Sequence, residues 1–551
     1  MRREGATCGE PGAPAKPKER AAMMTTSAFE ILGPIMVGPS SSHTAGALRI
    51  ALVARSLAPK GLRNVEFSLY NSFSHTYRGH GSDRALVAGM LGLAPDDARV
   101  RDSFALARKA GLKFSFVEAG DDAGRHPNTV RIVMRSDSGE EISLVGESVG
   151  GGRIRIGAIN GVRVEISGDY PTLFVTHLDR PGVLASLTGA LSASSSNIAT
   201  MRTYRERRGG SAHTVFELDD GIDPDLLSGL SAAPNVVSAR VVDIPGSSHV
   251  SPETHLRLGF NDGAELLALC RRGRTSIGGA MRRREEELES HEDVDARMAH
   301  VLEVMRDETT GPIERPERSL GGLIGGQARS LLDRGEELAG GLLGTTLTKA
   351  AAYAMATLER SATMGVIVAA PTAGSAGVVP GAVLAVSESL GSTDEEVRRA
   401  LWNACAIGAV VARNASVAGA EGGCQAEVGS AAAMAASAVA ELMGATPEVC
   451  LSAASTAIAN LLGLVCDPVR GLVEYPCQNR NAIGVANALV AAQLALSGVL
   501  DPLPFDEVVA AMKSVGDALP QSLRETALGG LAATASARTA TSRCASCGLC
   551  G

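Results

Sequence analysis

The chain has 551 residues with 45% hydrophobic and 20% charged residues, a composition typical of a globular protein of roughly three or four domains. A net charge of −8 and an aromatic content of 3% exclude a basic nucleic-acid surface and a stacking platform for bases. No apolar run follows the N-terminal Met-Arg-Arg-Glu, so we expect no secretory signal and a cytoplasmic location.

Residues 1–24 are rich in Gly, Pro, Lys and Glu and are expected to form a disordered head. From 25 to 168, helical periodicity alternates with strand-like runs. This pattern predicts an α+β domain. Its loops are rich in Ser, His and Gly, and loops of this kind commonly carry a functional site.

Residues 169–245 predict a βαββαβ module. Its Asp179-Arg-Pro-Gly182 turn and its Asn197-Ile198 pair resemble the ACT module, a ferredoxin-like domain that commonly binds amino acids at a paired interface. The resemblance implies that Asp179, Gly182 and Asn197 hold an amino-acid effector and that the chain forms a homodimer, with a tetramer equally compatible. A βαββαβ domain without a ligand is the alternative.

Residues 246–257 have the composition of a linker. From 258 to 535, strand signals almost vanish and Ala/Gly/Leu-rich helical spacing predicts an all-α domain. Two segments in it, 364–386 and 483–500, approach the length of a membrane span. Because prolines interrupt the first and Asn487 and Gln493 the second, we expect buried core helices and no membrane partner.

Three cysteines lie in polar islands of the helical region: Cys424 in EGGCQAE, and Cys466 and Cys477 in CDPVRGLVEYPCQNRN. Zinc favours closely spaced cysteine pairs. Separations of 42 and 11 residues instead favour an iron–sulfur cluster held from different helix ends. Three ligands leave one iron of a four-iron cluster open for Lewis-acid chemistry. Unrelated buried cysteines are the alternative, but a core would avoid the polar groups that flank each of them.

Three more cysteines, Cys544, Cys547 and Cys550, lie in the last eight residues with C-x2-C-x2-C spacing. Half of a ferredoxin motif and a zinc clip are alternatives for this spacing. The Ser/Thr/Ala-rich tether before it favours a mobile arm, the tail 536–551.

The N-terminal domain carries His43, His80 and His126 in Gly/Ser/Pro-rich loops. A single loop histidine is usually structural, but three in one domain predict a general base and a substrate ligand. His43 follows Pro-Ser-Ser-Ser at a turn that opens a helix, where backbone N–H groups can hold an anion. Residues 371–377, PTAGSAG, lack the Walker lysine and favour a backbone nest for a carboxylate over a phosphate site.

Together these strings resemble the iron–sulfur-dependent L-serine dehydratases (L-serine ammonia-lyases), from about residue 27 onward. PSSSHT and GHGSD match the family's β domain. PTAGSAG, GCQAE and CDPVRGLVEYPCQNRN match its α domain. The ACT-like module between them is similar to that of family members that carry one internally.

The resemblance implies a lyase that converts L-serine to pyruvate and ammonia with a [4Fe–4S] cluster. Its cluster ligands would be Cys424, Cys466 and Cys477, with Cys550, or else Cys544 or Cys547, on the open iron when substrate is absent. His126 and His80 are the expected bases, and His43 has a structural or anion-binding role. The expected substrate contacts are Ser41, Ser148, Thr372, Ser375, Asn479 and Arg480.

Two other functions stay open. A pyridoxal-phosphate dehydratase needs a Schiff-base lysine beside a phosphate-binding loop. None of the seven lysines has that context, and Lys349 comes nearest. An amino-acid-sensing iron–sulfur redox regulator fits the ACT-like module and the cysteines, but it leaves the Ser/His loops unexplained.

Overall fold

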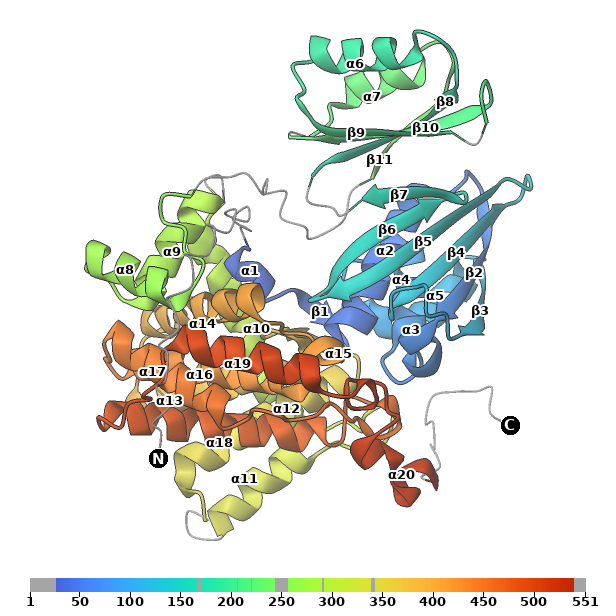
Figure 1. Ribbon diagram of the computed structural model, residues 1–551. Helices are drawn as coiled ribbons and strands as arrows, with labels where there is room; N and C mark the ends of the chain where they lie inside the picture. Colours follow the sequence, from blue (N-terminus) through green and yellow to red (C-terminus); the bar gives the residue numbers. More distant parts are fainter. Residues whose placement is uncertain are drawn as a thin grey trace, which may run out of the picture.

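The computed structural model describes seven stretches of the chain (Figure 1). They are residues 26–166, 170–205, 207–219, 221–242, 256–289, 292–337 and 342–539. The predicted head, most of the predicted linker and the three tail cysteines lie outside the described residues. The expected mixed α+β class is confirmed at this level: sheets occupy the N-terminal half and helices the C-terminal half.

The N-terminal domain is built on a six-stranded sheet of order β3-β2-β4-β5-β6-β7. Its strands are β2 Leu62–Tyr70, β3 Lys113–Gly120, β4 Thr129–Ser136, β5 Glu141–Gly150, β6 Arg153–Ile159 and β7 Val162–Ile166. Its helices are α2 Gly46–Ser56, α3 Asn71–Thr76, α4 Ser82–Leu91 and α5 Ser103–Lys109. The β2–β3 pair is parallel and the other pairs are antiparallel. Phe67, Ile132 and Leu144 on neighbouring strands are fully buried, and they join the apolar face of α2 in one core.

The next module places α6 and α7 on one face of a four-stranded antiparallel sheet of order β11-β8-β10-β9 (Figure 1). Its elements are β8 Thr172–Leu178, α6 Val183–Ala193, β9 Ile198–Arg205, β10 Ser211–Leu218, α7 Pro224–Ser231 and β11 Val236–Val242. Phe174, Val215 and Val242 belong to the core cluster of the N-terminal domain. The guanidinium of Arg240 also donates to the carbonyl of Ala58 at 3.1 Å. The module is therefore packed against the N-terminal domain.

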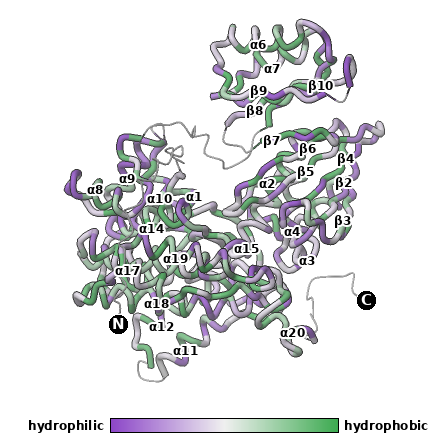
Figure 2. Tube along the Cα trace, viewed as in Figure 1, coloured by the Kyte–Doolittle hydropathy of each residue, from purple (hydrophilic) through white to green (hydrophobic). Residues whose placement is uncertain are grey.

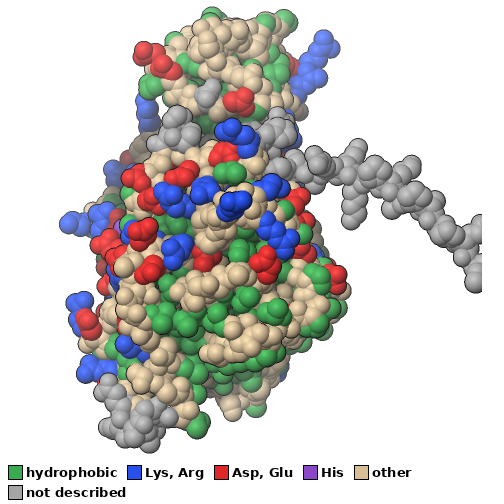
Figure 3. All heavy atoms as spheres, turned by 90° about the vertical axis from the view of Figure 1, so that its left-hand side faces the viewer, with side chains coloured by type: hydrophobic (Ala, Val, Ile, Leu, Met, Phe, Trp, Pro, Cys, Tyr) green, Lys and Arg blue, Asp and Glu red, His purple; other side chains and the backbone are tan. Residues whose placement is uncertain are grey.

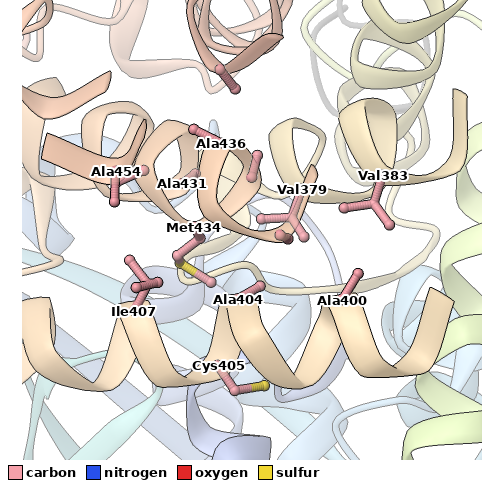
Figure 4. Close-up of a cluster of buried hydrophobic side chains, with 14 of the residues drawn as sticks. Val379, Val383, Ala400, Ala404, Cys405, Ile407, Ala431, Met434, Ala436 and Ala454 are labelled. Carbon is pink, nitrogen blue, oxygen red and sulfur yellow. The ribbon is translucent and has the colours of Figure 1, made fainter. Parts of the chain in front are cut away.

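The C-terminal domain is helical. Its helices are α8 Gly263–Gly273, α9 Ile277–Leu288, α10 Val294–Glu314, α11 Gln327–Glu337, α12 Gly344–Ala362, α13 Val378–Leu390, α14 Asp394–Asn414, α15 Gly419–Gly422, α16 Ser430–Leu442, α17 Pro447–Ala459, α18 Cys477–Leu496, α19 Phe505–Ala518 and α20 Ala535–Thr539. Small side chains line the contacts between α13, α14 and α16, so their backbones approach closely. Figure 4 shows Ala400, Ala404, Ala431 and Ala436 there, with Met434 filling the space between them.

The helical domain contains one short strand that the predicted all-α domain did not include. This strand, β12 Val366–Val368, consists of β-branched residues and pairs antiparallel with β1 Ile35–Val37. α1 Ala28–Ile31 precedes β1 and packs on α14, where Phe29 meets Trp402 edge to face at 5.7 Å. The N-terminal segment is thus anchored in the helical domain before the chain enters the six-stranded sheet.

The two segments of membrane length differ in burial. Residues 373–390 are long and apolar enough to cross a membrane, but 78% of this stretch is buried, as in a core helix. The segment 483–500 departs from the expected buried helix, because Ile483 and Val490 on α18 are 60% and 51% exposed. Residues of α18 such as Val485 and Ala488 are buried, so only one face of the helix joins the core. Figure 2 shows many hydrophobic residues along the helices of this domain. Figure 3 shows apolar side chains gathered on part of its surface.

Gly381 on α13 marks a place where two helices touch backbone to backbone. A Cβ at Gly381 would lie 2.7 Å from the carbonyl oxygen of Ala350 on α12. We expect Gly381→Ala to lower the free energy of unfolding by about 1–3 kcal/mol, because the clash outweighs the better helix propensity of alanine. Urea unfolding followed by circular dichroism measures this change.

Gly189 on α6 provides the matched control, since a Cβ there would meet nothing within 4 Å. We expect Gly189→Ala to be neutral or to stabilise the protein by up to about 1 kcal/mol. Equal effects of the two substitutions would contradict the tight contact between α12 and α13.

Candidate active site

A cavity of about 90 Å³ lies where the loops of the N-terminal domain meet the helical domain, and it has room for a few water molecules or a small metabolite. The N-terminal domain contributes the segments 39–42, 126–128 and 148–151. The helical domain contributes residues near the starts of α15, α16 and α18, and Glu525 from the segment after α19. Each half of the cavity therefore comes from a part of the chain remote in sequence from the other.

The first wall is a helix start. Ser41–Ala45 form one turn of π-helix, η1, that runs directly into α2, and the side chain of Ser40 caps it by accepting the N–H of His43 at 3.1 Å. A π-helical turn within an α-helix is rare and is often found at a functional site. The hydroxyl of Ser41 accepts the N–H of Ala373 at 2.9 Å, which joins η1 to the PTAGSAG loop of the helical domain.

The second wall brings together His126, Asn128 and Ser148. Asn128 and Ser148 are buried, and Asn128 Oδ1 and Ser148 Oγ have no hydrogen-bond partner among the described residues. Because buried polar atoms are normally satisfied, these two atoms are positioned for a ligand. His126 Nδ1 accepts the N–H of Asn128 at 3.2 Å, so the neutral ring carries its proton on Nε2.

The third wall holds Cys466 and Cys477, with Cys424 behind it. Cys424 and Cys477 lie at the N-terminal ends of the helical segments η4 (Gln425–Gly429)–α16 and α18. Cys466 lies in an extended segment, where its N–H donates to the carbonyl of Leu523 and its carbonyl accepts the N–H of Glu525. A helix N-terminus favours a thiolate, as a metal ligand requires.

The three thiols are close enough to influence one another, and none forms a disulfide. Burial raises the pKa of Cys424 to about 12 and those of Cys466 and Cys477 well above the ordinary value. The charges of Glu427 and Cys424 raise the pKa of Cys466 and Cys477 further, and Cys477 adds to the effect on Cys466. A cation bound among them would remove this repulsion. The donor set therefore fits a metal centre or cluster held by three thiolates.

Arg480 supports this set. Its guanidinium lies 2.8 Å from Asp467 and donates to the carbonyl of Val465 at 2.8 Å. Its charge counters the rise in the pKa of Cys424 and Cys477. The structure thus places Arg480 beside the cysteines, one turn along α18 from Cys477.

Two carboxyl groups also line the cavity, the half-buried Glu427 and the buried Glu525. Glu427 accepts the hydroxyl of Thr372 at 2.8 Å and lies 3.9 Å from Cys466 Sγ. Burial raises the pKa of Glu427 to about 6 and that of Glu525 to about 8, and the charge of Glu427 adds to the effect on Glu525. Glu525 has a φ of +59°, a strained value for a residue with a side chain, of the kind found at functional sites.

Behind this wall lie His43 and His80, both fully buried with ring centroids 4.3 Å apart. His43 contacts Ser42 Oγ and Ser72 Oγ, each at 2.9 Å, and its Nδ1 lies 3.9 Å from Glu525. Neither ring nitrogen of His80 has a partner among the described residues. Burial lowers the pKa of His80 to about 4 and that of His43 well below its ordinary value. Both rings are therefore neutral at physiological pH.

Burial of His80 predicts a pH dependence of stability. The unfolded chain takes up a proton near pH 6.5 and the folded ring only near pH 4, so the unfolded state binds more protons between these values. The contribution of His80 to the free energy of unfolding therefore rises with pH across this window and is level above it. We expect His80 to account for a loss of about 2 kcal/mol between pH 7 and pH 5, measured by urea unfolding.

His80→Asn should remove that part of the pH dependence, and the exposed His75 supplies the control variant His75→Asn. An unchanged slope between pH 5 and pH 7 in His80→Asn would show that His80 is not the group responsible.

Of the sequence-predicted residues, the cavity brings together Ser41, His126, Ser148, Thr372, Cys466 and Cys477. His43, His80, Cys424 and Arg480 lie directly behind its walls. Ser375 is buried and donates to the carbonyl of Ala370 at 3.1 Å, while Asn479 is exposed, and neither lines the cavity.

The three residues predicted for an effector lie in the β8–β11 module, apart from the cavity. Asp179 accepts the N–H of Gly209 at 2.9 Å and pairs with Arg205 at 3.2 Å. Gly182 has a φ of +88° and starts α6, with open space where a side chain would be. Asn197 donates to Asp219 at 2.6 Å.

Sequence reasoning missed Glu427, Glu525 and Asn128. Asn128 stands two residues after His126, and Glu427 stands in the quoted string GCQAE, so their neighbours could have pointed to them. Glu525 had no such signal: it stands in SLRETALGG, and only the fold brings it beside Cys466.

Comparison with known proteins agrees with this geometry. Residues 27–157 match the family model of the serine dehydratase beta chain and residues 272–532 that of the serine dehydratase alpha chain.

Relatives of both chains exist as separate proteins. A probable L-serine dehydratase alpha chain of Bacillus subtilis is 46% identical over 51% of this chain and 93% of its own length. An L-serine dehydratase beta chain of Peptoniphilus asaccharolyticus is 41% identical over 40% of this chain and all of its own length. An L-serine dehydratase of Streptomyces coelicolor is 32% identical over 92% of this chain and 99% of its own length. The chain therefore belongs to the serine dehydratase family, and it unites the alpha-chain and beta-chain regions in one polypeptide.

Proposed function

We propose that this protein is an L-serine ammonia-lyase that converts L-serine to pyruvate and ammonia. Loss of the α-proton and the hydroxyl group gives aminoacrylate and water, and hydrolysis of its imine tautomer gives pyruvate and ammonia. The observation that carries the proposal is the cavity itself, which joins the thiols of Cys466 and Cys477 to two unpartnered polar atoms and His126, with Cys424 and the neutral His43 and His80 directly behind its walls. L-serine dehydratases alignable over nearly the whole chain support serine as the substrate.

We infer that Cys424, Cys466 and Cys477 hold a [4Fe–4S] cluster. Their spacing and their positions on three separate segments, two helix starts and one extended segment, suit a cluster better than a compact zinc site. When bound, the cluster supplies a Lewis acid that eases departure of the substrate hydroxyl. Cys550, or else Cys544 or Cys547, remains the proposed fourth ligand, and all three lie outside the described residues.

Binding of the substrate is assigned to backbone and side-chain groups of the chain itself. The N-terminal end of η1 lines the cavity at Ser41 and Ser42, and backbone N–H groups at a helix start bind carboxylates. We assign the substrate carboxylate to this end. Asn128 Oδ1 can then accept from the substrate ammonium, and Ser148 Oγ can bond a polar group of the substrate.

For the α-proton, the hydrogen bonds favour His80 over His126. His126 already uses its Nδ1 lone pair on the N–H of Asn128, so it offers an N–H donor toward the cavity. His80 lies behind the cavity wall, with a ring nitrogen within 4.8 Å of a carboxylate oxygen of Glu525, which lines the cavity. It is neutral and has no partner for either ring nitrogen among the described residues, so it retains a lone pair to accept a proton. The ring of His43 contacts the ring of His80, and its Nδ1 lies 3.9 Å from Glu525.

We also propose that the β8–β11 module is an ACT domain that binds an amino acid, and that the protein is a cytoplasmic homodimer. The strand order β11-β8-β10-β9 with both helices on one face is that of a ferredoxin-like fold, which supports the first point. The exposed stripe Ile483, Val490 and Leu494 of α18 supports self-association. Light scattering on the purified protein tests the dimer, and a monomer at micromolar concentration would contradict it.

The proposed function is tested by incubating the anaerobically purified protein with L-serine and measuring pyruvate. A visible absorbance spectrum separates the cofactors, because a broad iron–sulfur band differs from a Schiff-base peak. No lysine of the described chain lines the cavity, and Lys349 pairs with Glu388 on the surface instead. Absence of pyruvate from a protein that carries a full cluster would favour the redox regulator.

A further inference from the structure

A second pocket, of about 260 Å³, adjoins the candidate active-site cavity. The two share the wall formed by Val149, Gly150, Gly151, Ala418 and Glu421. The second pocket extends from this wall to α1 and to the segment after α14. Exposed Arg153 lies on its lining, so the pocket reaches solvent.

The charged residues that line this pocket are two arginines and two glutamates, Glu30 and Glu421. Arg153 and Arg413 both line it, and neither has an ion pair or side-chain hydrogen bond within the described part of the chain. Its carboxylates, in contrast, are engaged. Glu421 accepts the hydroxyl of Ser416 at 2.6 Å, and the charge of Glu30 acts on the buried Arg49. The bond from Ser416 leaves the charge of Glu421 in place, but Arg153 and Arg413 have no ion-pair partner among the described residues and are available to bind an anion.

The shared wall is thin. Gly150 and Gly151 both have positive φ values, of 100° and 59°, and present no side chain. A Cβ at Gly151 would meet nothing within 4 Å, and one at Gly150 would meet only Ala418 at 3.7 Å. Backbone and one methyl group are thus the main separation between the two spaces in this region.

We propose that this pocket is a vestibule that binds the carboxylate of the amino acid before it enters the active-site cavity, through Arg153 and Arg413. The inference rests on the proposed function, since both L-serine and pyruvate carry a carboxylate. A guanidinium pairs with a carboxylate through two parallel hydrogen bonds. A cleft that concentrates one sign of charge also raises the local concentration and the capture rate of the opposite ion.

The test compares the double variant Arg153→Gln/Arg413→Gln with Arg108→Gln/Arg272→Gln, which removes two exposed arginines away from both pockets. At low salt we expect kcat/KM for L-serine to fall on the order of tenfold in the vestibule variant, and kcat to fall far less. The difference should shrink as ionic strength rises. The control variant should match the wild type, and Arg413→Lys alone should keep most of the activity.

Direct titration with pyruvate, followed by ligand-observed NMR at low salt, gives a readout that does not depend on turnover. Weaker pyruvate binding by the vestibule variant than by the control supports the proposal. Equal binding and equal kcat/KM in the two variants overturn it, even if the wild type produces pyruvate. A wild type that makes no pyruvate from L-serine overturns the proposed function, while the pyruvate titration still decides whether the vestibule exists. Thermal unfolding of each variant shows whether it is folded.

Discussion

Replacing Cys466 or Cys477 by Ala is expected to lower kcat for L-serine at least about a thousandfold, because a Lewis acid contributes several kcal/mol to such a reaction. Both thiols line the cavity, and the charge of Cys477 acts on the pKa of Cys466. Losing one donor of three leaves two buried thiols that can no longer hold a cluster. Iron and acid-labile sulfide per chain, measured after anaerobic reconstitution, should fall together with activity.

Cys450 provides the matched control. It is 1% exposed in the helical core on α17 and does not line the cavity. Cys450→Ala should keep its iron content and its activity, with at most a loss of stability from the small cavity it leaves. If Cys466→Ala retained a full complement of iron and sulfide, the three-cysteine cluster would be wrong even if activity fell.

The second large effect is expected at His80. His80→Asn should lower kcat on the order of 10²- to 10⁴-fold, the usual contribution of a general base, with iron content unchanged. A substrate deuterated at the α-carbon should show a larger isotope effect on kcat in the variant, because proton removal would then limit the rate. His126→Asn should act mainly on KM, since its ring is assigned to hydrogen bonding of the substrate and keeps no free lone pair.

The opposite pattern would reassign the base. If His126→Asn abolished turnover while His80→Asn remained active with a normal isotope effect, then His126 would be the base and its bond to Asn128 would have to break on substrate binding. Iron content and the thermal unfolding midpoint of both variants are the controls. At pH 7 the His80 ring of the wild type is neutral, so its protonation does not lower the free energy of unfolding there. His80→Asn must therefore be folded at pH 7 for the comparison to hold.

Much of the fold follows from local patterns. The alternation of apolar residues in β2 and β4 and the Ala-rich spacing of α13 to α17 are visible in the sequence, because strand and helix periods are properties of neighbouring residues. The same holds for the βαββαβ order of residues 172–242. β12 escaped prediction because three residues are too short for a period, and its partner β1 lies more than 300 residues away.

By itself, the sequence determined the chemistry that the chain can offer: three cysteines in polar islands, three loop histidines and the strings that carry the family resemblance. These are properties of residue type and spacing, so they are visible in the sequence alone. Only the tertiary structure decided how these groups meet. Three sets of contacts depend on packing and backbone direction. They are the hydrogen bond between Ser41 and Ala373, the position of Glu525 beside Cys466 and His43, and the hydrogen bond that His126 accepts from Asn128. Contacts that join residues from opposite ends of the chain leave no local pattern, so the cavity and the pocket beside it could be found only in the folded molecule.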